Sequence, residues 1–308
     1  MRSQTMDEKE KLANWSEQLP PKAKEQFKTE MNKFLTYEPQ VAIFGKTGVG
    51  KSSLTNALFG KDVCEVSDVE ACTREPQEVF LKLEGASNGI KLLDVPGIGE
   101  NAERDKQYFK LYAKILEEAD MALWVLKGDD RSFSVDEEFY KICMKPYIDA
   151  GKPFVVAVNQ VDKIEPYREW NEAKHIPGPV QEGNIAKKLN YVAQQFGDLK
   201  ISQVVAVSAN ENYNLPNLML QLIKGLPADK RYQTIRNMDE QLQKNQKLKE
   251  NASEALAEAV HDIIDDLPLP ESVKAAGKLA VSGIIAAVDT GVDIVGNAIS
   301  KILDFFCW

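Results

Sequence analysis

Length, composition and charge set the first limits on this chain. It has 308 residues, of which 44% are hydrophobic, enough for one buried core domain with an added segment. Its net charge is -9 and its pI is about 5.1. This acidic balance excludes a broadly basic nucleic-acid-binding protein and disfavours attraction to anionic lipid headgroups.

The cysteines, histidines and apolar runs narrow the class further. The four cysteines include no Cys-x-x-Cys pair and there are two histidines, so zinc ligation is not expected. The first residues lack the apolar core of a signal peptide, and no run of about 18 apolar residues predicts a membrane-spanning helix. We therefore expect a cytoplasmic protein in a reducing environment.

The first 38 residues have a charged helical pattern. Apolar residues recur at helical spacing on both sides of Pro20 and Pro21: Leu12, Trp15 and Leu19 before them, and Phe27, Met31 and Phe34 after them. Because proline interrupts a helix, the pattern predicts two helices with a break between them. We assign residues 1–38 to an N-terminal helical segment.

Short aliphatic runs alternate with polar helical stretches from residue 39 to residue 227. The runs lie at residues 41–44, 79–83, 90–95, 121–126, 154–158 and 204–207. Runs of this kind are typical of strands buried on both faces of a parallel sheet between helices. A short turn-rich link, EGASNG, joins the second run to the third and indicates a hairpin, so one strand should be antiparallel. The sequence predicts an α/β three-layer sandwich with a mostly parallel six-stranded sheet.

Two further segments stand outside this alternation. Residues 163–183 contain three prolines and are predicted to form an insert, which we call the insert throughout. Residues 228–308 return to a helical pattern and form a C-terminal helical segment, expected to pack with the N-terminal helices. Its last part has an apolar stripe at steps of three and four residues: Val281, Ile285, Val288, Val292, Val295, Ile299, Ile302 and Phe306. The alternative is that this amphipathic helix docks on a membrane or a protein partner.

A glycine-rich loop follows the first predicted strand. Residues 45–53 read GKTGVGKSS and fit the pattern G-x-x-x-x-G-K-[ST] between a strand and a helix. Glycines let backbone N–H groups turn toward phosphate oxygens, and the helix N-terminus adds positive partial charge. We expect Lys51 to contact the outer phosphates and act in catalysis, and the Ser52 hydroxyl to bind Mg²⁺. The alternative is a glycine-rich turn that binds no ligand.

Three short segments at the ends of other predicted strands favour a ligand. In DVPG, Asp94 can hold Mg²⁺ through water, and the Gly97 amide can contact the terminal phosphate. In NQVD, the carboxylate of Asp162 can accept hydrogen bonds from guanine N1–H and the exocyclic amine, a donor pair that adenine lacks. SAN, which begins at Ser208, places a backbone N–H near guanine O6. Each segment alone is a weak signal, but their order and spacing together predict a guanine-nucleotide site.

The residues expected to contact the nucleotide come from these four segments. They are Gly45, Lys46, Thr47, Gly48, Val49, Gly50, Lys51, Ser52, Ser53, Asp94, Gly97, Asn159, Gln160, Asp162, Ser208, Ala209 and Asn210.

The set of segments resembles a known family. GKTGVGKSS, DVPG, NQVD and SAN, with CTREP around Thr73, resemble the five boxes of the translation-factor-related P-loop GTPases and are most similar to the Era-like branch. Within that branch, CTREP and DDRSFSVDEEFY resemble the bacterial YfjP-type GTPases, with a more distant likeness to immunity-related and septin-like GTPases. The resemblance covers residues 39–226. It implies a P-loop NTPase fold that hydrolyses GTP to GDP and phosphate. It also implies a switch threonine, Thr73, with its hydroxyl on Mg²⁺ and its carbonyl near the attacking water.

Several residues depart from the family pattern. Ile98 stands where the Ras-like branch has a glutamine that orients water, and isoleucine cannot do so. Gly48 replaces an asparagine that helps to hold K⁺ in several relatives. Gln160 and Asn210 stand where lysine is usual, so we expect weaker affinity with the guanine preference kept by Asp162. The water must therefore be oriented by the backbone or by a group supplied in trans. Candidates for the activating group lie in or near the segments CTREP, DVPG and DDRSFSVDEEFY; they are Arg74, Glu100, Arg104 and Arg131.

These observations predict a slow, regulated GTPase that requires Mg²⁺ and is activated by nucleotide-dependent dimerisation or by a partner. The alternative is a GTP-dependent assembly module, or a module peripherally attached to a membrane, in which hydrolysis is secondary.

Overall fold

The computed structural model describes the backbone of residues 2–60, 77–82, 89–94, 102–197, 199–288 and 302. Side chains are described for residues 8–60, 108–197, 199–287 and 302. The chain divides into two units. One combines the two ends of the chain, up to Tyr37 and from Pro227 onward, and the other is Glu38–Leu226. The segment Asn237–Leu242 groups with the second unit, where the Asp239 N–H donates to the Leu58 carbonyl at 3.0 Å.

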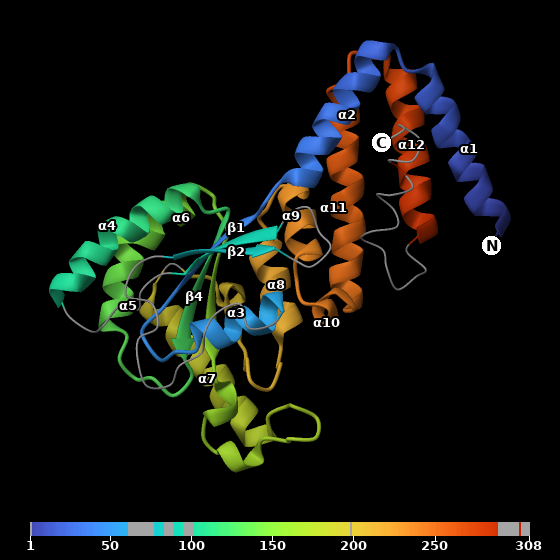
Figure 1. The fold of residues 1–308 in the computed structure, drawn as a ribbon. Helices are drawn as coiled ribbons and strands as arrows, with labels where there is room; N and C mark the ends of the chain where they lie inside the picture. The colour runs from blue at the N-terminus through green and yellow to red at the C-terminus, as the bar shows by residue number, and fades with distance from the viewer. Residues whose placement is uncertain are drawn as a thin grey trace. The chain divides into compact units, whose positions relative to one another are not determined.

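The second unit is built on one sheet (Figure 1). Its strands are β1 (Gln40–Phe44), β2 (Gln77–Lys82), β3 (Gly89–Asp94), β4 (Met121–Lys127), β5 (Phe154–Asn159) and β6 (Val204–Ala206). Their order across the sheet is β2-β3-β1-β4-β5-β6. β2 pairs antiparallel with β3, and every other pair is parallel. The predicted fold class, with its single antiparallel strand, is confirmed.

Helices cover both faces of this sheet. The elements are α3 (Lys51–Phe59), α4 (Ala102–Glu118), α5 (Ser134–Phe139), η1 (Tyr140–Met144), α6 (Lys145–Asp149), α7 (Pro179–Gln195) and α8 (Leu215–Ile223), with short 3-10 turns η2 (Val161–Lys163), η3 (Tyr167–Glu169) and η4 (Ile201–Gln203). Phe44, Trp124 and Val156 belong to one core with side chains of α4, α5, η1, α6 and α7. The residues that alternate with them are buried on the other face, where α8 packs on β4, β5 and β6.

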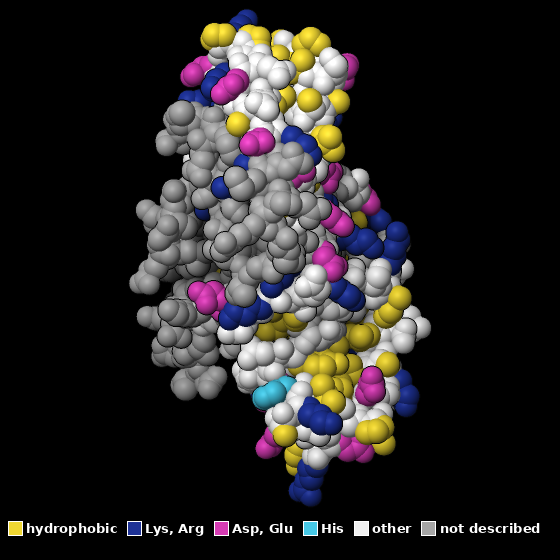
Figure 2. All heavy atoms as spheres, turned by 90° about the vertical axis from the view of Figure 1, so that its right-hand side faces the viewer, with side chains coloured by type: hydrophobic (Ala, Val, Ile, Leu, Met, Phe, Trp, Pro, Cys, Tyr) yellow, Lys and Arg dark blue, Asp and Glu magenta, His cyan; other side chains and the backbone are white. Residues whose placement is uncertain are grey.

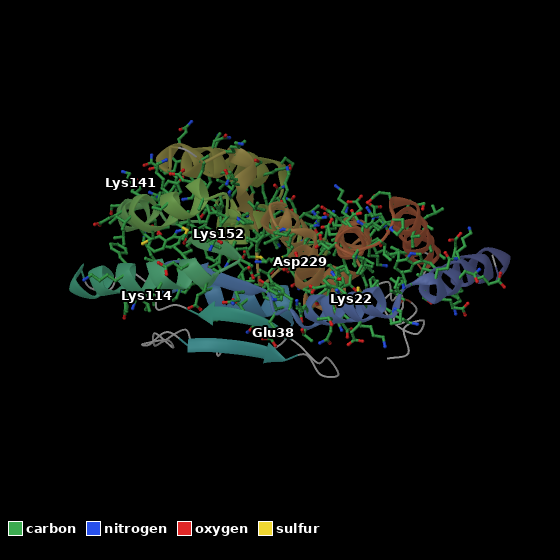
Figure 3. The ribbon with its side chains drawn as sticks, turned by 90° about the horizontal axis from the view of Figure 1, so that it is seen from above. Lys22, Glu38, Lys114, Lys141, Lys152 and Asp229 are labelled. Carbon is green, nitrogen blue, oxygen red and sulfur yellow. The ribbon has the colours of Figure 1, made fainter. Side chains whose placement is uncertain are left out.

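An aromatic cluster fills the first of these two layers. The rings of Trp124 and Phe139 stack with their centroids 4.2 Å apart, and Tyr112 meets Phe139 edge to face at 5.0 Å. Lys152, labelled in Figure 3, fastens the end of α4 because its ammonium donates to the carbonyls of Leu116, Glu117 and Ala119. Such donors at the last carbonyls of a helix satisfy groups that have no partner within it.

The first unit is a helical bundle. It contains α1 (Arg2–Gln18), α2 (Pro21–Thr36), α9 (Ala228–Arg236), α11 (Gln246–Asp265) and α12 (Glu271–Val288). The short α10 (Glu240–Gln243) precedes α11 in the chain and groups mostly with the second unit. The break at Pro20 and Pro21 is confirmed. α1 packs on α12, and α11 packs on α2, α9 and α12, so helices from the two ends of the chain share one core. The indole N–H of Trp15 donates to the Val273 carbonyl at 2.8 Å.

The apolar stripe of the last helix is described only in part. Val281 and Ile285 are buried in α12, and Ile302 is also buried. The other predicted positions of the stripe lack a described side chain. No helix among the described residues is long and apolar enough to span a bilayer.

Candidate nucleotide site

The glycine-rich loop lies between β1 and α3, as the sequence predicts. Gly48 and Gly50 have φ angles of 80° and 87°, a left-handed backbone that favours glycine. A Cβ on Gly50 would lie 2.6 Å from the Asn159 amide nitrogen, and one on Gly45 would lie 2.4 Å from the Val125 carbonyl oxygen. The loop therefore needs glycine at both its ends. Between them, Thr47 and Gly48 are exposed, which leaves the tip of the loop open to a ligand.

Lys51 is the first residue of α3. Its ammonium donates to the carbonyls of Gly45 and Lys46 at 3.0 and 3.1 Å, so the side chain folds back over the loop. Ser52 follows it in the first turn, where backbone N–H groups have no partner within the helix. The loop thus gathers an ammonium, a hydroxyl and a helix N-terminus, the groups that bind phosphate and Mg²⁺.

The side chain of Lys46 contacts acidic residues that follow β4 in the chain. Its ammonium lies 2.6 Å from Asp136 and 3.2 Å from Asp130, and it donates to the Ser132 carbonyl at 2.6 Å. Asp136 is fully buried and also accepts from the Trp124 indole at 3.2 Å. Burial alone would lower the pKa of Lys46, but the two carboxylates outweigh it and raise that pKa. The lysine side chain therefore links the glycine-rich loop to the segment after β4. The predicted contact with phosphate would then be made by the backbone of Lys46.

Asn159, at the end of β5, joins the glycine-rich loop to the segments NQVD and SAN, which are predicted to bind the base. It is 1% exposed. Its amide nitrogen donates to the Val49 and Gly50 carbonyls at 3.1 and 3.4 Å, and its amide oxygen accepts from the Ala209 N–H at 3.1 Å. One side chain thus brings together three segments that the sequence predicted to form one site.

Gln160 and Asp162 follow in the turn after β5. Gln160 has a left-handed φ of 60°, and its amide oxygen accepts from Lys163 at 3.1 Å. The Oδ1 atom of Asp162 is buried and has no hydrogen-bond partner among the described residues. A buried carboxylate oxygen without a donor is costly unless a ligand supplies one. Guanine N1–H and its amine are donors of the required kind.

The last predicted segment forms a tight loop after β6. Ser208 pairs with Tyr213 in an isolated antiparallel bridge, and the Ser208 hydroxyl accepts from the Glu211 N–H at 3.3 Å. Ser208 and Ala209 are buried, whereas Asn210 is exposed. The exposed Asn210 side chain is consistent with a position at the rim of the site.

Gln181 is a residue of this site that the sequence did not reveal. It lies in the first turn of α7, is fully buried, and donates to the carbonyls of Asp162 and Ile164, both at 2.9 Å. It therefore fixes the turn that carries Asp162. A glutamine in a helical stretch gives no local signal of such a role, because its acceptors are 17 and 19 positions away.

The remaining predicted residues are described less fully. Thr73 and Gly97 lie outside the described residues, and Asp94 is described only as the last backbone position of β3. Among the proposed activating groups, Arg131 has a described side chain. It is exposed and lines a cavity of about 580 Å³ with Lys163 and Lys188, beside α7.

A glycine cradle and an ammonium over it fit the phosphates of a nucleotide. In the turn after β5, a carboxylate oxygen that has no hydrogen-bond partner among the described residues fits guanine. The fold and the site therefore define a P-loop GTPase. The family model described as "50S ribosome-binding GTPase" matches residues 40–160. Two uncharacterised proteins of Escherichia coli (strain K12) match nearly the whole chain. YkfA is 34% identical over 94% of each chain, and YfjP is 33% identical over 96% of each.

A third relative is GTPase Era of Aquifex aeolicus (strain VF5), 32% identical over 61% of this chain and 56% of Era. A crystal structure of a point variant of Aquifex aeolicus Era bound to GDP.AlF4- has a TM-score of 0.45 and 30% identity, over 61% of this chain and 56% of that one. The chain belongs to the Era-like P-loop GTPases, in the family that contains YkfA and YfjP. It binds and hydrolyses GTP.

Proposed function

We propose that this GTPase is a slow switch that uses Mg²⁺ and is activated by a second copy or a protein partner. The observation that carries its guanine specificity is the buried Oδ1 of Asp162, which has no hydrogen-bond partner in the described part of the chain. Asn159 and Gln181 fix the turn that carries it next to the glycine-rich loop. The slow rate follows from Ile98, because an apolar side chain cannot orient the attacking water.

Mg²⁺ fits the donor set that the sequence provides. Ser52 at the N-terminus of α3 would bind the ion, together with Thr73 and Asp94. Bound there, the ion would neutralise charge on the β- and γ-phosphates. Lys51 would stabilise the same charge from the loop. With these groups alone, phosphates are positioned but the water is not, and this favours activation in trans.

The test is GTP hydrolysis at a series of protein concentrations. We expect hydrolysis per molecule to rise with protein concentration, or on adding a partner, and Lys51→Ala to lose it. Lys114→Ala, an exposed lysine of α4 labelled in Figure 3, is the matched control and should keep the parent rate. A Lys51→Ala variant that hydrolyses GTP as fast as the parent would exclude the proposed site. A rate independent of concentration and of every partner tested would exclude the regulation.

A second candidate is a GTP-dependent assembly or membrane module in which hydrolysis is incidental. The apolar stripe of the last helix favours this candidate. In this case the protein would lie in the cytoplasm and attach peripherally to a membrane. Size-exclusion chromatography with a GTP analogue, with GDP and without nucleotide tests the assembly. Liposome flotation under the same three conditions tests the attachment. An unchanged elution volume and no flotation would end this candidate.

A further inference from the structure

The insert (residues 163–183) borders an open pocket beside the turn that carries Asp162. A cavity of about 550 Å³ is lined by Asp162 on one side and by side chains of the insert, among them Tyr167, Trp170 and His175, on the other. Figure 1 shows the insert as the yellow-green projection beyond the end of β4. Asp162, the residue that we assign to guanine, is among the residues that line this pocket, so the pocket adjoins the base end of the proposed site.

Glu211 fastens the insert to the loop after β6. Its Oε2 atom accepts from the Trp170 indole N–H at 3.2 Å and lies 2.8 Å from Nδ1 of His175. The Trp170 ring also meets Tyr213 edge to face, with centroids 5.4 Å apart. One carboxylate therefore joins the insert to the segment that carries Ser208 and Ala209, and hydrogen bonds to a charged acceptor are the stronger kind.

The other end of the insert is fixed to the base-binding turn. Oε2 of Glu169 accepts from the backbone N–H groups of Val180 and Gln181 at 3.0 and 3.2 Å, and so caps α7. Gln181 in turn holds the carbonyls of Asp162 and Ile164. The insert is thus tied both to the turn that carries Asp162 and, through Glu211, to the loop after β6.

Three large hydrophobic side chains of the insert are exposed among its charged residues. Tyr167 is 49% exposed, Ile176 is 44% exposed and Val180 is 57% exposed. Figure 2 shows hydrophobic side chains gathered close to the one histidine visible in that view. Aromatic faces at the mouth of a cavity suit a flat heterocycle, because base–aromatic stacking is sequence-tolerant and favourable.

We propose that the insert is a cap over the base end of the guanine-nucleotide site, and that Glu211 is the positioning residue that holds it closed. This inference rests on the proposed site for guanine. Asp162 reads the edge of the base, and the aromatic side chains of the insert cover the base and the ribose. Because Glu211 acts through Trp170 and His175 of the insert, we expect it to affect how tightly nucleotide is held and not the rate of the chemical step.

The experiment compares the full-length protein with Glu211→Ala and Glu211→Gln. The probes are GDP and a non-hydrolysable GTP analogue in the presence of Mg²⁺. We expect Glu211→Ala to weaken both by about 10-fold, because two bonds to a charged acceptor are lost, and single-turnover hydrolysis of saturating GTP to keep the parent rate. Glu211→Gln keeps an acceptor for Trp170 and should recover part of the affinity. Glu138→Ala, an exposed carboxylate of α5, is the matched control.

A second readout follows the cap directly. GDP should change the tryptophan fluorescence of the parent protein, and Trp170→Phe should abolish most of that change because the other three tryptophans lie outside the insert. This variant also tests the cap if Glu211→Ala does not fold. Parent affinity in Glu211→Ala together with a fluorescence change unaffected by Trp170→Phe would overturn the cap. Failure of the parent protein to bind GDP at all would instead overturn the guanine site itself.

Discussion

Asn159 shows how a single side chain can hold a nucleotide site together. Its amide donates to two carbonyls of the glycine-rich loop and accepts from one N–H of the loop after β6, and the side chain is almost fully buried. Buried polar groups of this kind cost free energy when their partner is removed. The asparagine thus holds the glycine-rich loop and the loop after β6 together. Its loss would let the phosphate-binding and base-binding parts of the site move apart.

We predict that Asn159→Ala weakens GDP binding by about 10- to 100-fold and lowers the free energy of unfolding by about 1–3 kcal/mol, because it leaves buried groups unpaired. Calorimetric titration and urea unfolding measure the two effects. Asn190→Ala is the control, since that exposed amide donates to the Ala186 carbonyl within its own helix, α7. Equal GDP affinity in Asn159→Ala and the control would contradict the role given to Asn159.

The ion pair between Lys46 and Asp136 is a second interaction between single residues that can be tested. Removing the lysine leaves a fully buried carboxylate without its cation, and such losses cost about 3–5 kcal/mol of unfolding free energy. We expect that loss in Lys46→Met, and most of the stability should return in Lys46→Met with Asp136→Asn. Urea unfolding is the measurement, and Lys33→Ala, which breaks the exposed pair with Glu30, should cost less than about 0.5 kcal/mol.

The same pair gives a dependence on pH with a definite sign. The pKa of Lys46 is raised in the folded protein, so the contribution of its protonation to stability is fully present below the ordinary pKa of lysine, provided that Asp136, whose own pKa is raised by burial, is ionised. That contribution is lost as the pH rises through the raised pKa. A parent protein and a Lys46→Met variant whose stabilities converge at strongly alkaline pH would agree with this assignment, and a constant difference would not.

Two glycines in helices, one closely packed and one open to solvent, test how tightly neighbouring helices pack. A Cβ on Gly277 of α12 would lie 2.4 Å from the Trp15 ring of α1, whereas one on Gly183 of α7 would meet nothing within 4 Å. We expect Gly277→Ala to destabilise the protein by about 1–3 kcal/mol through overpacking. Gly183→Ala should stabilise it by about 0.5–1 kcal/mol through helix propensity. Thermal unfolding of both variants decides this, and the same sign for both would contradict the close approach of α1 to α12.

Sequence patterns predicted the elements well where the signal is local. Pro20 and Pro21 mark the break between α1 and α2, and the six aliphatic runs mark the strands, because both depend on neighbouring residues. The roles of Gln181 and Glu211 could not be predicted in this way. Their partners are distant in sequence, so only the packing of α7 and the insert brings them together.

The direction of a side chain within a recognised motif is equally hard to predict. GKTGVGKSS identifies the loop, but it does not show that Lys46 faces Asp136, a residue far along the chain. The motif constrains the backbone, whereas the side chains that point away from the ligand depend on the rest of the fold. Gln160 is a second example, because its amide oxygen accepts a hydrogen bond from Lys163, a contact that the motif does not reveal.

At the scale of the whole molecule, the chain combines a GTPase unit with a helical unit made from both of its ends. A ligand that binds only the folded protein stabilises it by an amount that grows with its concentration, about 2.7 kcal/mol at 100 times its Kd. The nucleotide is therefore expected to shift the folding equilibrium of the GTPase unit. The acidic net charge of -9 offers anionic nucleotides no general attraction, so binding must come from the local groups of the site.

The most direct test of this account is a titration of the purified protein with GTP, GDP and ATP in the presence of Mg²⁺, beside Asp162→Asn. We predict that GTP and GDP bind, that ATP does not, and that the variant loses the preference for guanine because its side chain can no longer accept both guanine donors. ATP binding as tight as that of GTP, or an unchanged guanine preference in Asp162→Asn, would contradict the assignment of Asp162 and with it the guanine-nucleotide site.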